Sequence, residues 1–126
     1  MNHAGHELHP TVCAQELGLA FKIPITADDI VGRIDAFMSA LTSSLQDDGC
    51  KLIGHIKGFL EVERNHPLFF SVTSFEEKAS YKGELPHEIS KAKLTINVIV
   101  YGVEKANVER AIHEGLEKHV MNNGQG

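Results

Sequence analysis

The sequence lacks the features that mark membrane and secreted proteins. No apolar run approaches the roughly 18 residues needed to cross a bilayer. The amino terminus has no cationic region followed by an apolar one, so we expect no secretory signal. The two cysteines, Cys13 and Cys50, form no CxxC pair, which favours a reducing, cytoplasmic location over a disulfide framework. The formal net charge of -5 disfavours nucleic acid and anionic membranes as partners, because both attract basic surfaces.

The sequence also lacks the short motifs of common catalytic sites. It contains no GxxxxGKS or GxxxxGKT phosphate loop, no GxGxxG after a strand, no HExxH zinc motif and no GxSxG nucleophile turn. Ser71 or Ser74 could be paired with a histidine, but a chain with 8 histidines offers such pairs by chance. We therefore expect a protein that is not an enzyme.

Length and composition fit one globular domain. The chain has 126 residues, of which 42% are hydrophobic and 23% charged, as in ordinary globular proteins. We expect a single domain over residues 14–121. A flexible histidine-rich tail over residues 1–13 precedes it in this interpretation, and a frayed tail over residues 122–126 follows it.

Two segments have the pattern of amphipathic helices. Thr26 is a predicted N-cap, and two acidic residues follow it in the first turn, where carboxylates are favourable. The first helix ends before Gly49, and a second is expected over residues 104–120. The apolar stripe of the first helix recurs with a period of about 3.6 residues, at Ile30, Ile34, Phe37, Met38, Leu41 and Leu45.

Alternation of apolar and polar residues predicts the strands. Residues 83–92 break the alternation and are predicted to be a loop. The order of elements is β-α-β-β-(β)-β-α, which predicts an α+β fold: a two-layer, ferredoxin-like sandwich with both helices on one face of a mostly antiparallel sheet. Strands are expected over residues 15–25, 50–62, 68–75, 78–82 (a short edge strand) and 93–101.

The strand over residues 50–62 is predicted to have two different faces. Gly54 and Gly58 lie within it, and glycines inside a strand are typical of a bulge or of a close approach to the backbone. The face expected to pack in the core carries Leu52, Ile56, Leu60 and Val62.

The opposite face of this strand carries the residues that we single out as a binding site: His55, Lys57 and Phe59. His55 and Lys57 lie about 7 Å apart at the backbone, a spacing at which both can hold an anion or the carboxylate of a partner. The alternative is a solvated sheet surface that flanks Phe59. The helix-free face of the sheet is expected to gather further residues, namely Gly18, Ala20, Lys22, Thr73, Phe75, Asn97 and Tyr101.

The second candidate site is the histidine-rich amino terminus. His3, His6 and His9 recur every third residue, and Cys13 follows four residues later. Imidazole and thiolate suit a divalent transition metal such as zinc or cobalt, and short histidine-rich tracts bind such ions even when disordered. Because the spacing matches no closed zinc site, a solvated tail is the alternative.

The segment His55-Ile56-Lys57-Gly58-Phe59-Leu60 resembles the signature of a known family. It is similar to a basic-x-Lys-Gly-apolar strand in the C-terminal domain of the CobW family of metal-handling GTPases. The order of elements is similar over residues 15–120, including an apolar strand from Leu94 to Gly102 and a helix through Leu116. His55 stands where the family usually has arginine. The family often has a histidine-rich segment ahead of this domain, as this chain does.

The resemblance implies a stand-alone accessory domain, because the Walker lysine and the Cys-x-Cys-Cys metal motif of the family's GTPase half are missing from this sequence. It implies a non-catalytic module that handles cobalt, zinc or a corrinoid cofactor beside a separate GTPase. The expected partner is that GTPase, a corrinoid protein or a second copy of the chain. A different hypothesis also fits the residues: an oligomeric, ferredoxin-like module that binds a small ligand or regulates, with Phe59, Phe75 and Tyr101 buried in a dimer.

Overall fold

The chain folds into five strands and two helices, which the computed structural model describes for residues 9–63 and 67–121. His3, His6 and the tail over residues 122–126 lie outside the described residues. No helix in the described part is long and apolar enough to cross a membrane. The elements are β1 (Pro10–Thr26), α1 (Ala27–Asp47), β2 (Leu52–Glu61), β3 (Leu68–Val72), β4 (Ser80–Lys82), β5 (Glu88–Tyr101) and α2 (Lys105–Gly115), which continues into the π-helical turns η2 (Leu116–Met121).

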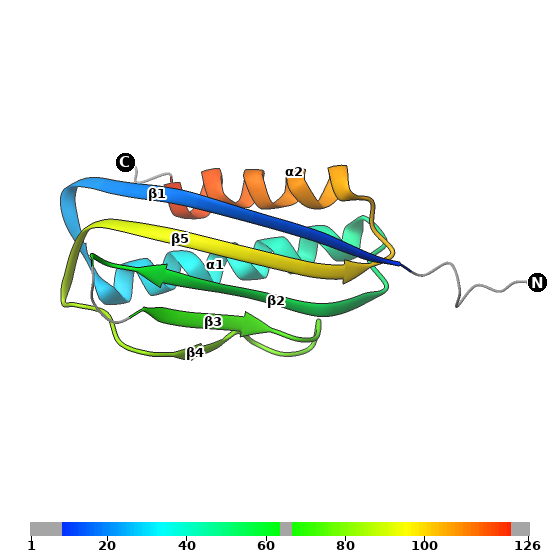
Figure 1. The fold of residues 1–126 in the computed structure, drawn as a ribbon, viewed down its shortest axis with the longest axis horizontal. Helices are drawn as coiled ribbons and strands as arrows, with labels where there is room; N and C mark the ends of the chain where they lie inside the picture. Colours follow the sequence, from blue (N-terminus) through cyan, green and yellow to red (C-terminus); the bar gives the residue numbers. More distant parts are fainter. Residues whose placement is uncertain (1–8, 64–66, 122–126) are drawn as a thin grey trace, which may run out of the picture.

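The strands form one sheet in the order β1-β5-β2-β3-β4, and every neighbouring pair is antiparallel. Because β1 and β2 are both antiparallel to β5, they run parallel to each other on either side of it, joined by α1. Both helices cover the same face of the sheet (Figure 1). The predicted two-layer α+β sandwich on a ferredoxin-like plan is therefore confirmed.

Helix α1 forms where the sequence predicts it, because its signals are local. The backbone N–H of Asp29 donates a hydrogen bond of 3.0 Å to the Thr26 hydroxyl, which caps the helix. The predicted apolar stripe is buried along its whole length. Gly49 follows the helix with a φ of 91°, the left-handed conformation that glycine adopts readily.

Strands β1 and β5 are longer than the sequence predicts. β1 begins at Pro10 and has 17 residues, and β5 begins at Glu88 and has 14. The second half of the predicted loop over residues 83–92 is therefore strand, which corrects that half of the prediction, whereas residues 83–87 are outside the strands as predicted. Ile25 pairs with Ile89, and Ile89 is fully buried. The cross-strand partner stabilises this segment as strand, although its own alternation is weak.

Strand β2 contains a bulge that reverses its faces near the start. The register with β5 shifts between Ile53 and His55, so Gly54 is the extra residue. Ile53 is consequently buried at 3% exposure, whereas Leu52 is 53% exposed. The prediction of Leu52 as core was wrong, because alternation was extended through the bulge. The predicted core residues Ile56, Leu60 and Val62 are buried.

Gly58 lies on the core side of β2, opposite Phe70 of β3. A Cβ atom at Gly58 would overlap the Phe70 ring and lie 2.6 Å from the backbone oxygen of Thr95. The close approach that the two glycines suggested is thus made within the protein, by the buried ring of Phe70. Because of this contact, the inward side chains of β2, β3 and β5 pack together in one core.

We expect Gly58→Ala to destabilise the protein by about 2–3 kcal/mol, because the added methyl group overpacks a rigid part of the core. The free energy of unfolding from urea denaturation measures the loss. Gly18→Ala is the matched control in a strand, since a Cβ atom there would have no neighbour within 4 Å. Equal stabilities for the two variants would contradict the close packing of Phe70 on Gly58.

Candidate functional site

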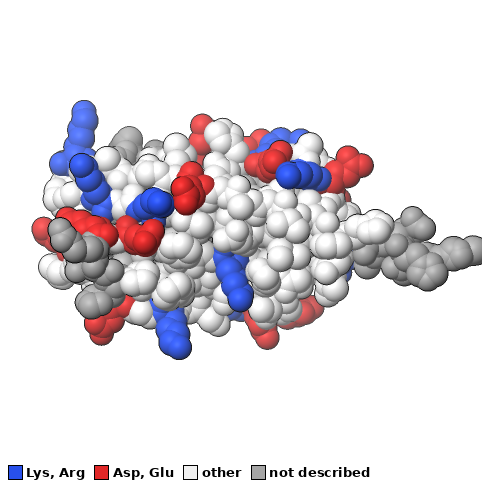
Figure 2. Space-filling model, in the orientation of Figure 1, with Lys and Arg blue, Asp and Glu red and all other residues white. Residues whose placement is uncertain are grey.

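The candidate site lies on the open face of the sheet, the face that no helix covers. Val12, Leu52 and Phe69 are each about half exposed there, at 52%, 53% and 50%. Charged side chains are sparse across the middle of this face and gather at its left end and along its upper right margin (Figure 2). An uncovered sheet face of this kind is a usual place for a partner or a ligand to bind.

Cross-strand pairing arranges the open face into rows. In one row, Lys57 of β2 lies between Asn97 of β5 and Ser71 of β3, and Ser71 pairs with Ser80 of β4. The row is therefore polar from β5 to the β4 edge.

The adjacent row combines aromatic rings with a second cation. Phe59 pairs with Phe69, and Phe69 pairs with Lys82. The two phenylalanine rings are tilted by 45° with their centroids 5.8 Å apart. Directly opposite residues share a face of the sheet, so these side chains lie next to the polar row.

A hollow of about 660 Å³ spans these two rows. Its lining, in the part of the chain that the structure describes, combines ammonium groups, hydroxyl groups and aromatic rings and includes no carboxylate. The side chains on which its chemistry depends are Lys57, Phe59, Phe69, Ser71, Ser80 and Lys82. A volume of several hundred cubic ångströms is typical of small-molecule sites.

The three residues predicted as an anion or partner site all lie on the open face, but only two of them line the hollow. Lys57 and Phe59 line the hollow. His55 lies one row away, opposite Ile99, and is not part of the lining. Their role in binding stays a prediction.

The sequence reasoning missed Lys82 and gave no role to Ser71 and Ser80. Alternation over residues 68–75 places Ser71 on the same face as Phe69. The register between β3 and β4 that brings Ser80 and Lys82 beside them has no signal in the sequence, because the connecting loop is irregular.

Phe75 does not belong to the open face, contrary to the prediction. β3 ends at Val72, and Phe75 packs on the helix side, in a hollow that it shares with Met38 of α1. The Thr73 hydroxyl donates a hydrogen bond of 2.9 Å to Glu77 within the same loop. A dimer surface made jointly by Phe59, Phe75 and Tyr101 is therefore wrong, since Phe75 lies on the other side of the sheet.

The edge strand β4 is held in place from the helix side. The Tyr81 hydroxyl donates a hydrogen bond of 2.8 Å to Asp35 of α1. Burial and this contact raise the pKa of Tyr81, so the phenol stays protonated and keeps donating. Because Tyr81 points toward α1, its neighbours Ser80 and Lys82 point to the open face.

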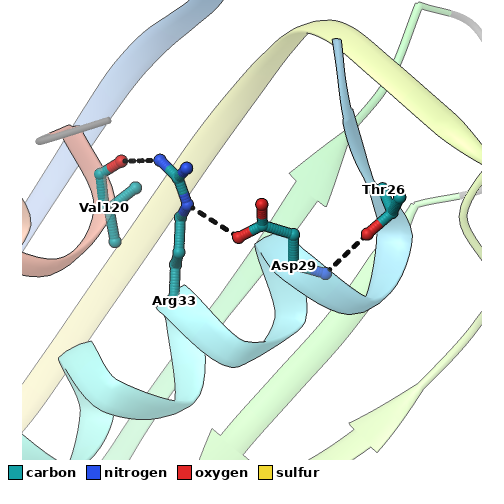
Figure 3. Close-up of polar contacts among 4 residues, drawn as sticks. All are labelled: Thr26, Asp29, Arg33 and Val120. Atoms are coloured by element: carbon teal, nitrogen blue, oxygen red, sulfur yellow. Dashed lines mark hydrogen bonds and ion pairs between the residues drawn. The ribbon is translucent and has the colours of Figure 1, made fainter. Parts of the chain in front are cut away.

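Arg33 of α1 ties three elements together on the helix side (Figure 3). Its guanidinium group donates to Asp29 at 3.1 Å and to the backbone oxygen of Val120 in η2 at 3.2 Å. It also lies 5.4 Å from the centroid of the Phe21 ring in β1. These contacts satisfy the guanidinium group within the fold, so we assign Arg33 a structural role.

Of the four predicted metal ligands, the structure describes Cys13 and His9. Cys13 lies in β1, 4% exposed, and burial raises the pKa of its thiol, as does nearby Glu109. His9 is exposed. Among the described residues, no group of three His, Cys, Asp or Glu side chains is arranged to hold a metal ion. Metal binding by the tail stays a prediction.

No family model matches the sequence, and no curated protein is similar to it. Two solved structures resemble the fold, both of Zn(II)-bound YjiA GTPase. The E. coli protein aligns at 14% identity with a TM-score of 0.42. A triple mutant of YjiA aligns at 15% identity with a TM-score of 0.45.

Each alignment covers 82% of this chain and 29% of the YjiA chain, so this chain spans less than a third of the length of that protein. YjiA is a GTPase of the CobW family. Alignments with TM-scores below 0.5 do not place this chain in that family or assign it an activity.

The Thr95 hydroxyl, on the open face beside Phe59, is buried and has no hydrogen-bond partner within the described part of the chain. We expect Thr95→Val to raise the free energy of unfolding by about 1 kcal/mol, because it removes an unpaired polar group at nearly constant volume. Thermal and urea denaturation measure the change.

Thr11→Val is the matched control for Thr95→Val. The Thr11 hydroxyl donates a hydrogen bond of 2.7 Å to the backbone oxygen of Val103. Its loss should lower stability by about 1 kcal/mol. A loss of stability in Thr95→Val as well would mean that its hydroxyl has a partner in solution.

Proposed function

We propose that this chain is a non-catalytic accessory module that docks a protein partner on the open face of its sheet. In the form that its sequence resemblance implies, the partner is a separate GTPase of the CobW kind, and the pair handles cobalt, zinc or a corrinoid cofactor. The observation that carries the proposal is the uncovered sheet face itself, which exposes Val12, Leu52 and Phe69 and carries the cation of Lys57.

The strand that resembles the CobW signature supports this choice of surface. β2 lies in the middle of the sheet, between β5 and β3. Lys57 and Phe59 of the signature face the open side, whereas Gly58 faces Phe70 in the core. The glycine of the signature thus serves packing, and the lysine is available for recognition.

The chemistry of the open face favours binding over catalysis. Among the described residues, the hollow gathers lysine, serine and phenylalanine side chains and includes no carboxylate, imidazole or thiol to exchange protons near neutral pH. Lysine and serine can hold an anionic group of a partner, and the phenylalanine rings supply apolar contact.

A metal ion would be cargo for this module rather than a part of its core. Cys13 is buried in β1, whereas His9 is exposed. We therefore propose that His3, His6 and His9 present the metal, and that Cys13 would join them only if the start of β1 opened. Neutral imidazoles are suitable ligands for zinc or cobalt.

The docking surface is tested by measuring the binding of the purified chain to the CobW-family GTPase of the same organism by isothermal titration calorimetry. We expect Phe69→Asp to weaken binding at least tenfold, because it places a carboxylate in the middle of the docking face. Ser43→Asp, on the exposed side of α1, adds the same charge away from that face and should bind as the wild type does. Equal affinities of the two variants, or no binding by the wild type, would overturn the proposal.

Metal presentation is tested by titrating Co²⁺ or Zn²⁺ against a competing chromophoric chelator. We expect the triple variant His3→Ala, His6→Ala, His9→Ala to lose at least tenfold in affinity, because each imidazole is a ligand. Substitution is preferable to deletion of residues 1–13, since Pro10 to Cys13 are part of β1. Cys13→Ala should retain wild-type affinity. Unchanged affinity in the triple variant would remove the tail from metal binding.

A further inference from the structure

We propose that the hollow on the open face binds a small anion that carries a flat apolar body, such as an aryl carboxylate or an aryl phosphate. The site is built from Lys57, Ser71, Ser80 and Lys82 for the anionic group and from Phe59 and Phe69 for the ring. This inference goes beyond the proposed function, because it concerns a small ligand bound by the free chain and requires no GTPase.

The charge of the hollow opposes that of the whole protein. The chain carries a net charge of -5, yet the described residues that line the hollow include two lysines and no acidic side chain. Neither Lys57 nor Lys82 forms an ion pair with any described residue. Lys93, on the same face but outside the hollow, lies 3.7 Å from Glu16. The two lysines of the hollow therefore remain available to an anion from outside.

The positions of the two lysines let both reach one anionic group. Lys57 is on the central strand and Lys82 on the edge strand, two strands and one row apart. With strands about 4.8 Å apart and rows about 6.7 Å apart, their Cα atoms are separated by about 12 Å. Ser71 lies between them on β3, so a bound anion accepts from two ammonium groups and a hydroxyl group.

The aromatic side of the hollow favours a ligand that has a flat apolar body in addition to its anionic group. Phe69 is 50% exposed and lies 5.8 Å from Phe59, ring centroid to ring centroid. An exposed pair of tilted rings offers a surface on which a flat apolar body loses its contact with water. An inorganic anion cannot use this surface, so the hollow selects a ligand that has both parts.

The floor of the hollow is fixed before any ligand binds. Gly58 and Phe70 are in contact beneath it, and the Phe70 and Tyr81 ring centroids are 6.4 Å apart. Tyr81 is in turn bonded to Asp35 of α1. A preformed site loses little conformational entropy on binding, which favours affinity for a small ligand.

The probes that test this inference are naphthoate and naphthyl phosphate, with neutral naphthol and inorganic phosphate as partial probes. Binding to the full chain is followed by calorimetry and by NMR shifts of the amides of β2, β3 and β4. We expect both complete probes to bind, with shifts centred on Ser71 and Phe69, and each partial probe to bind at least tenfold more weakly. The stronger of the two complete probes identifies the preferred anionic group.

Lys57→Gln and Lys82→Gln should each weaken the complete probes by about tenfold, because each variant removes one charge-assisted hydrogen bond. Lys91→Gln is the matched control, since Lys91 is exposed on the sheet outside the hollow. The inference would be overturned if all three variants bound the complete probes with equal affinity, or if naphthol bound the wild-type chain as tightly as the complete probes do. GTPase binding measured on the same variants separates this outcome from failure of the proposed function.

Discussion

Burial of one face of the sheet beneath α1 is the constraint on which the rest of the structure depends. The apolar stripe of α1 forms one continuous core with the inward side chains of β2 and β5. That core requires the inward face of β2 to approach β3 closely at Gly58, where the Phe70 ring takes the place of a side chain. It also requires the bulge at Gly54, which turns Ile53 inward and Leu52 outward.

The open face is the other side of this arrangement. Because both helices pack on the same face of the sheet, every second residue of the five strands faces away from them and remains available to solvent or to a partner. The polar row through Lys57 and the aromatic row through Phe59 are set by the same register that builds the core. The hydrogen bond from Tyr81 to Asp35 fixes the position of β4 as well. Lys82 of β4 therefore lines the same hollow as Lys57 of the central strand β2.

The three proposed activities use two parts of the chain and different chemistry. Protein docking and ligand binding use the open face, where cations and aromatic rings are combined. Metal presentation uses imidazoles of the amino terminus, because the thiol of Cys13 is enclosed in the core. A module that holds a metal at one place and a partner at another suits transfer of cargo between proteins.

The sequence by itself determined the elements whose signals are local. The Thr26 cap, the stripe of α1 and the alternation of β5 after Leu94 depend on residues a few positions apart, so the α+β sandwich and the outward placement of Lys57 and Phe59 followed. Only the tertiary structure decided what depends on pairing between distant strands: the extension of β5 back to Glu88, the bulge at Gly54 and the inward turn of Phe75. The hollow belongs to this second group, because the register that sets Lys82 beside Phe69 is fixed by burial of Phe70 in the core and by the bond from Tyr81 to Asp35 of α1.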